Sequence, residues 1–157
     1  MTRPCARAPR GARAISKVPF GHWQTSTLIQ AIDQDGVRAA LVIDGASNTV
    51  VFETFIEQIL IPRLKPGDII ILDNLASHKS ARTQNLIESA GAELRFLPPY
   101  SPDLNPIEKV FSKLKSILKR LEPRSRLKLW DAITYAIEKI TPTDCRNCFK
   151  ACGYNAT

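Results

Sequence analysis

Two acidic residues, Asp73 and Glu108, are spaced so that they could bind a metal ion together. Asp73 directly follows the apolar run Ile69–Leu72, whose branched side chains are typical of a buried strand. A carboxylate at the carboxyl end of a buried strand points into the crevice where open α/β sheets bind ligands. Glu108 falls in the first turn of a helix that Pro106 begins, and Asn105 is the expected cap of that helix.

The chain between the two acids, residues 74–107, contains 34 residues. This length accommodates a helix, a strand and a loop, so the chain can leave the sheet and return Glu108 to Asp73. Two converging acidic oxygens suit a hard cation such as Mg²⁺. In the alternative interpretation, Asp73 merely ends a strand and Glu108 favours a helix N-terminus by its charge. The spacing alone leaves both interpretations open.

The sequence around the two acids resembles a known family. Residues 72–79 (LDNLASHK) and 97–108 (LPPYSPDLNPIE) closely resemble the DDE transposases of the mariner superfamily, with the bacterial insertion-sequence branch nearest. The resemblance extends over about residues 7–154. It implies a ribonuclease H-like α/β fold, in which helices flank a mixed sheet. It also implies an endonuclease that cleaves DNA at transposon ends and transfers the freed strand to target DNA.

The resemblance implies roles for individual residues. Asp73 and Glu108 would be catalytic and would ligate two Mg²⁺ ions, for which Mn²⁺ can substitute. Asn74 and His78 would support the two acids or contact DNA. The alternative for His78 is a surface or helix-capping role. The partners implied are transposon-end and target DNA, and the complete enzyme is expected to be a homodimer.

One part of the family pattern is missing from this sequence. In the family fold, a central strand carrying the first catalytic aspartate precedes the strand Thr25–Ile32, and a helix-turn-helix region lies earlier still. No acidic residue precedes Asp33 here, so we expect a chain truncated at its N-terminus, inactive alone and marginally stable. Asp44 could take the place of the missing acid, although an aspartate before a glycine is also common in turns.

Basic residues are concentrated in two segments. The net charge is +7, and residues 1–20 carry five basic side chains and no acid, whereas residues 109–128 carry eight and one acid. Basic segments flanking a metal site would suit a polyanion, and the alternative is a solvated surface. The candidate DNA-binding residues are Arg10, Arg13, Lys17, Lys79, Lys115 and Lys119.

We expect one domain over residues 1–157, with a basic extended segment at 1–20 and C-terminal helices at 127–157. The predicted order is a hairpin, a helix, a strand, a helix, a strand and three helices. The predicted elements are strands Thr25–Ile32 and Val37–Ile43, a helix from Asn48 or Thr49 to Pro62, strand Ile69–Asp73, helix Ser80–Ala90, strand Glu93–Leu97, and helices Pro106–Leu121, Leu127–Ile140 and Pro142–Ala151. In the helix from Pro106, one stripe is apolar, and a separate stripe carries Glu108, Lys115 and Lys119.

The remaining features concern cellular location and the cysteines. No apolar stretch approaches the length of a membrane span and no secretory signal is present, so we expect a cytoplasmic bacterial protein that acts at the nucleoid. Cys145, Cys148 and Cys152 are interpreted as reduced, helix-borne thiols. A zinc site would need Cys5 or a histidine from another segment.

Three functions are therefore compared. The first is a transposase catalytic domain. The second is an inactive transposase remnant that retains nonspecific DNA binding. The third, from another class, is a small metal-binding interaction module built on the C-terminal cysteines.

Overall fold

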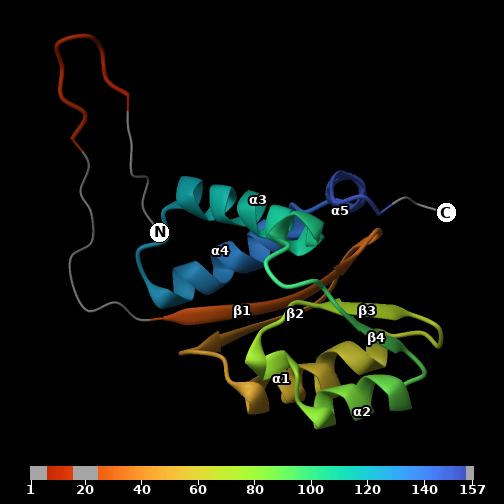
Figure 1. Cartoon of the computed structure of the whole chain (residues 1–157). Helices are drawn as coiled ribbons and strands as arrows, with labels where there is room; N and C mark the ends of the chain where they lie inside the picture. The colour runs from red at the N-terminus through yellow and green to blue at the C-terminus, as the bar shows by residue number, and fades with distance from the viewer. Residues whose placement is uncertain (1–6, 16–24, 155–157) are drawn as a thin grey trace.

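The computed structural model describes residues 7–15 and 25–154, and Figure 1 shows the arrangement of its elements. Its helices and strands, in chain order, are β1 (Ser26–Asp33), β2 (Gly36–Asp44), α1 (Thr49–Phe55), a π-helical turn (Ile56–Leu60), a 3₁₀ turn (Ile61–Arg63), β3 (Ile69–Leu72), a 3₁₀ turn (Ala76–His78), α2 (Ala81–Ser89), β4 (Glu93–Phe96), a 3₁₀ turn (Pro102–Leu104), α3 (Pro106–Leu121), α4 (Arg126–Glu138) and α5 (Pro142–Ala151).

The first two strands form an antiparallel hairpin. The pairing runs from Ser26 opposite Asp44 to Asp33 opposite Gly36, with a shift in register after Ala31. In the turn, the backbone N–H of Asp35 donates to Oδ1 of Asp33 at 2.8 Å. Gly36 adopts φ +135°, a conformation that side-chain-bearing residues rarely adopt. The hairpin predicted from the Asp33–Gly36 segment is confirmed.

Strands β3 and β4 are parallel and are joined through α2. Ile69 pairs with Glu93 and Leu72 with Phe96. Ser80 caps α2, because its hydroxyl accepts the backbone N–H of Thr83. This unit delivers the chain from the carboxyl end of β3 back to the carboxyl end of β4, where the loop toward α3 begins.

Helices cover both faces of the β1–β2 hairpin (Figure 1). Alternate residues of β1 face opposite sides, as a strand requires. Leu28 and Ile32 pack against a buried cluster from α3, α4 and α5, whereas Ile29 and Ala31 pack against a second cluster from α1, its π-helical turn and α2. The second cluster also receives Ile70 and Leu72 of β3, so the hairpin lies between two hydrophobic cores.

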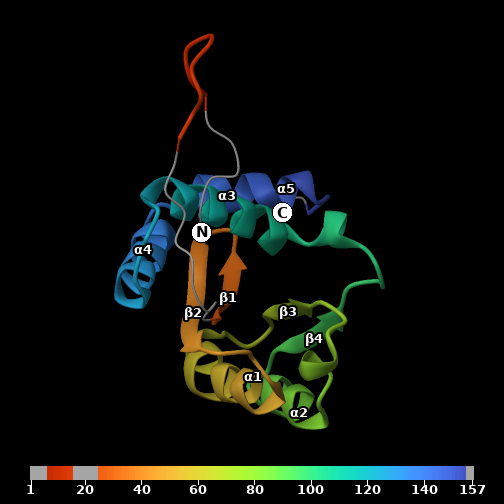
Figure 2. The same ribbon diagram turned by 90° about the vertical axis from the view of Figure 1, so that its left-hand side faces the viewer.

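The two pairs of strands lie in the spatial order β2, β1, β3, β4 (Figure 2). Within the described residues, β1 pairs only with β2 and β3 pairs only with β4. β1 and β3 are therefore not paired with each other in the described structure. Ala12–Ile15 form no strand, and residues 16–24 lie outside the described part.

Most predicted boundaries agree with the structure to within two residues, with two informative differences. The helix beginning at Thr49 becomes π-helical at Ile56, and Phe55, Ile56 and Leu60 are all buried in the core. Asn105 occupies the N-cap position of α3, but its side chain accepts no capping hydrogen bond. The prediction that Asn105 caps the helix is therefore right about its position and wrong about its hydrogen bond. Pro106 at the first helical position has no backbone N–H to satisfy.

None of the helices in the described ranges combines the length and apolar character needed to cross a membrane.

The start of α5 gives a prediction about stability in acid. Asp144 lies 2.5 Å from Lys113 Nζ and completes a capping box with Thr141. The Lys113 ammonium and the Thr141 donors lower the Asp144 pKa from 3.8 to about 2. A depressed carboxyl pKa contributes stability above the unfolded-state value, and this contribution disappears as pH falls through the folded-state value. We expect Asp144→Asn to lower the free energy of unfolding by about 1 kcal/mol near neutral pH, as the loss of a partly exposed cap does.

Urea unfolding of both chains at a series of pH values measures this effect. The difference between wild type and Asp144→Asn should shrink between pH ~4 and ~2. A difference that stays constant down to pH ~2 would show that the ionised carboxylate does not stabilise α5.

Candidate active site

A pocket of about 170 Å³ lies between the carboxyl end of β3 and the N-terminus of α3. Its walls bring together Asp73, from the residue after β3, and Glu108, from the first turn of α3. The complete lining consists of Asp73, Asn74, Leu97, Pro98, Tyr100, Ser101, Pro102, Asn105 and Glu108. The chain therefore brings the two acids to one pocket across the intervening residues 74–107.

The backbone around Asp73 is fixed by the sheet. The N–H of Leu97 donates to the carbonyl of Leu72 at 2.9 Å, which extends the β3–β4 pairing by one bond. The side-chain amide of Asn74 donates to the carbonyl of Leu97. Asn74 thus ties the end of β3 to the end of β4, and this is a structural role for one of the two residues expected to support the acids.

The carboxylate of Asp73 is oriented through one of its oxygens. Oδ1 accepts the backbone N–H of Leu75 at 3.1 Å and lies 2.8 Å from Nδ1 of His78. The His78 contact is close, but the ring N–H is not aligned on the carboxylate. No described residue donates to Oδ2, and the side chain is 40% exposed. Asp73 therefore retains one oxygen for an added ligand.

His78 is placed by an aromatic ring from α1. Its imidazole stacks on Phe52, with ring centroids 4.0 Å apart and planes 28° apart. Burial lowers the pKa of His78, and the nearby Asp73 carboxylate opposes that shift. Burial therefore favours the uncharged form of the ring, which lies beside Asp73 without a hydrogen bond to it. Phe52 was not singled out in the sequence, because only the tertiary fold brings it to His78.

Glu108 is exposed on the first turn of α3. The preceding loop is held in place from the other end of the chain, since the Tyr154 hydroxyl donates to the carbonyl of Leu104 at 3.0 Å. The backbone N–H of Glu108 bonds to the carbonyl of Asn105 at 3.2 Å. These bonds fix the loop before α3 and the first turn of α3.

The other acid considered for the site, Asp44, does not line this pocket. It forms an ion pair with Arg126 at the start of α4. The described residues contain no group of three histidine, cysteine, aspartate or glutamate side chains arranged to hold a metal ion. Within the described ranges, the pocket has a pair of acids and no third.

None of the described candidate DNA-binding residues lines the pocket itself. Lys115 and Lys119 are exposed on α3, and Lys79 lies 5.9 Å above the ring of Phe96. Arg10 and Arg13 are exposed in the described segment 7–15, and Lys17 lies outside the described residues.

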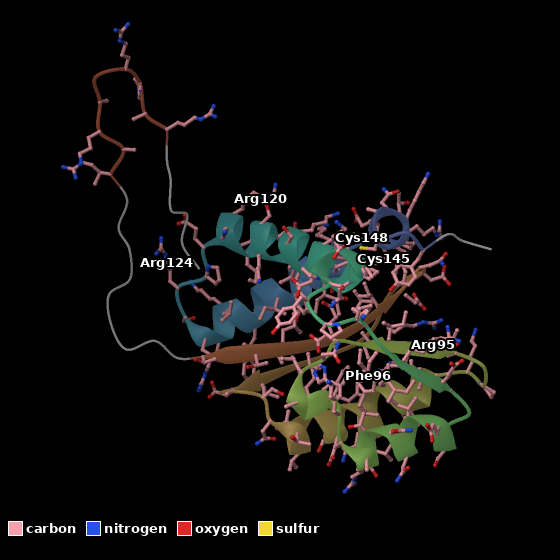
Figure 3. All side chains as sticks on the ribbon, in the orientation of Figure 1. Arg95, Phe96, Arg120, Arg124, Cys145 and Cys148 are labelled. Atoms are coloured by element: carbon pink, nitrogen blue, oxygen red, sulfur yellow. The ribbon has the colours of Figure 1, made fainter. Side chains whose placement is uncertain are left out.

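The C-terminal cysteines belong to the core. Cys145 and Cys148 lie on α5 where it packs near α3 (Figure 3), and Cys145 is fully buried. Burial raises the pKa of the Cys145 thiol to about 11, and it raises those of Cys148 and Cys152 as well. Protonated thiols suit hydrophobic packing, whereas metal ligation needs thiolates. Cys5, which a zinc site could have used, lies outside the described residues.

The sequence matches the model of a family described as DDE superfamily endonuclease over residues 1–129. The chain belongs to this family, and the resemblance to DDE transposases in the two sequence stretches around the acids is confirmed. The bacterial insertion-sequence branch stays a prediction. No curated protein matches the chain in sequence.

Solved transposase structures share the fold. The Mos1 strand transfer complex is 18% identical, covering all of this chain and 51% of that one, with a TM-score of 0.58. A Mos1 paired-end complex with the left transposon end gives 18% identity, 98% and 51% coverage and a TM-score of 0.56. The Mos1 catalytic domain with raltegravir and Mn is 19% identical, with 84% of this chain and 78% of that chain covered and a TM-score of 0.51. This chain spans about half the length of the first two, and the predicted ribonuclease H-like α/β fold is confirmed.

Proposed function

We propose that this chain is part of the catalytic domain of a DNA transposase that moves a bacterial insertion sequence. The observation that carries the proposal is the meeting of Asp73 and Glu108 in one pocket of a DDE-family fold. The substrates would be DNA at transposon ends and at a target site. We further propose that the complete enzyme works as a homodimer in the bacterial cytoplasm, at the nucleoid.

The donors in the pocket fit a hard divalent cation. Asp73 offers a free oxygen, and Glu108 offers an exposed carboxylate. Two Mg²⁺ or Mn²⁺ ions, when bound, would supply an activated water and a counter-charge for the leaving oxygen in phosphodiester cleavage. Asp73 and Glu108 would hold the ions. The Leu75 N–H would keep Oδ1 of Asp73 occupied, which would leave Oδ2 available to a ligand.

The basic residues suit the DNA backbone. Along a helix axis, Lys115 lies ~10 Å and Lys119 ~16 Å from Glu108 at ~1.5 Å per residue. A strand whose scissile phosphate enters the pocket would therefore meet further positive charge along α3. Because contacts to phosphate carry no sequence information, the proposed binding is nonspecific and strongly dependent on salt.

A second candidate is a DNA-binding remnant without cleavage activity. It is favoured by the pair of acids, rather than three, in the described part of the pocket. Two acids offer two metal ions fewer oxygen ligands than three acids would, so the ions would be held less tightly. We expect cleavage by this chain alone to be at background level, and the experiment below therefore measures binding first.

Fluorescence anisotropy with labelled DNA tests the proposal. We expect Ca²⁺, which supports coordination with little cleavage, to tighten DNA binding relative to EDTA. The reason is that a cation held by Asp73 and Glu108 also binds phosphate oxygens. Asp73→Ala and Glu108→Ala should lose this increment, while Glu88→Ala, which removes an acid from α2, should keep it.

Equal DNA affinity in Ca²⁺ and EDTA would contradict the proposed site. Nicking of supercoiled plasmid in Mg²⁺ or Mn²⁺ completes the test. Nicking that disappears in both Asp73→Ala and Asp44→Ala would instead assign Asp44 as a third acid.

A further inference from the structure

Tyr100 has two unusual properties together. Its side chain is fully exposed, at 102% of the reference accessible surface. Its backbone adopts φ +57°, in the left-handed region. Bulky residues rarely occupy this region, because Cβ crowds the backbone there.

The loop imposes this conformation. It begins after Leu97, which is bonded to both Leu72 and Asn74, and it ends at Leu104, which accepts the hydroxyl of Tyr154. Between these anchors, the Ser101 hydroxyl donates to the carbonyl of Pro99 at 3.3 Å. The strain at Tyr100 is therefore maintained by its surroundings.

The ring of Tyr100 contributes little to the stability of the described fold. A fully exposed ring buries no apolar surface, and asparagine or glycine would adopt this backbone conformation more easily. Strained residues of this kind concentrate at sites that bind ligands. Tyr100 also lines the pocket that contains Asp73 and Glu108, beside Pro98 and Pro102.

We propose that Tyr100 stacks on an unpaired nucleobase of the DNA strand whose phosphate enters the pocket. This inference rests on the proposed function. A flat aromatic ring held beside a phosphate site provides a stacking surface for any base, because every base has a π-face. Lys79, 5.9 Å above Phe96 near the end of β4, adds positive charge by which the backbone of the same strand can be held.

The experiment uses the whole chain with two DNAs of equal length, a blunt duplex and a duplex with frayed, unpaired ends. 2-Aminopurine in the unpaired segment reports stacking through its fluorescence. Tyr100→Phe keeps the ring, and Tyr100→Asn removes the ring but tolerates the backbone. Tyr135→Asn is the matched control, because Tyr135 is 46% exposed on α4 and does not line the pocket.

We expect Tyr100→Asn to bind frayed DNA about five- to a hundredfold more weakly, as loss of one base–aromatic stack does. It should lose the 2-aminopurine signal and should bind blunt duplex almost normally. Tyr100→Phe and Tyr135→Asn should behave like wild type. The melting temperature of Tyr100→Asn should not fall, because asparagine fits the left-handed conformation, so weaker binding cannot be attributed to misfolding.

Other outcomes overturn the inference. Wild-type affinity and signal in Tyr100→Asn would show that the ring does not contact the base. Equal losses in Tyr100→Phe and Tyr100→Asn would assign the role to the hydroxyl. If wild type binds neither DNA, the proposed function fails and this inference fails with it, whereas loss of stacking alone leaves the proposed function intact.

Discussion

Asp73→Asn and Glu108→Gln are each expected to abolish divalent-cation binding in the pocket. Both substitutions keep side-chain size and remove the negative charge, and the described pocket contains no other acid. Loss of a partner outside the ligand shell commonly costs ~10–100-fold in metal affinity, so loss of a direct ligand should cost at least that much. Titration of Mn²⁺, followed by electron paramagnetic resonance of the free ion, measures this effect without any catalytic turnover.

The control substitutions for this titration are Asp44→Asn and Asp103→Asn, which remove acids that do not line the pocket. We expect both to bind Mn²⁺ like wild type. Wild-type Mn²⁺ affinity in Asp73→Asn would refute the assignment of Asp73 as a ligand. A loss in Asp44→Asn as large as that in Asp73→Asn would show that Asp44 reaches the site.

Reversing two charges on α3 should produce the second large effect. The Lys115→Glu/Lys119→Glu chain is expected to bind DNA at least about tenfold more weakly at low salt. The slope of log affinity against log salt should fall by about 1.8, because each phosphate contact contributes about 0.9. Fluorescence anisotropy between about 50 and 200 mM salt measures both quantities.

The control is Lys65→Glu/Lys139→Glu, which makes the same change in net charge at exposed residues outside α3 and the pocket. A net-charge effect would weaken binding equally in both double variants. Equal weakening would therefore contradict a specific DNA path along α3, and an unchanged salt slope would contradict phosphate contacts by Lys115 and Lys119.

Much of the fold follows from local patterns in the sequence. The turn at Asp33–Gly36, the apolar run before Asp73 and the amphipathic period after Pro106 each depend on neighbouring residues, and each is found in the structure. The expected meeting of Asp73 and Glu108 rested on chain length between them and on the family phrases, and both line one pocket.

The features that the sequence did not reveal depend on distant residues. Phe52 reaches His78 only because α1 packs beside the turn after β3. Lys113, another basic residue of α3, is paired with Asp144 of α5. The left-handed backbone of Tyr100 results from anchors on both sides of its loop, and no propensity of tyrosine predicts it. Each of these features depends on contacts between segments rather than on periodicity.

The pocket joins the two hydrophobic cores. Asp73 follows β3, which packs into the core of α1 and α2, whereas Glu108 lies on α3, which belongs to the core of α4 and α5. Within the described residues, no strand pairing links β1 to β3. A cation shared by the two acids would therefore cross-link the two cores. It would raise the free energy of unfolding by RT ln(1 + [cation]/Kd). The affinity for the cation and the gain in the free energy of unfolding would therefore report on the same interaction.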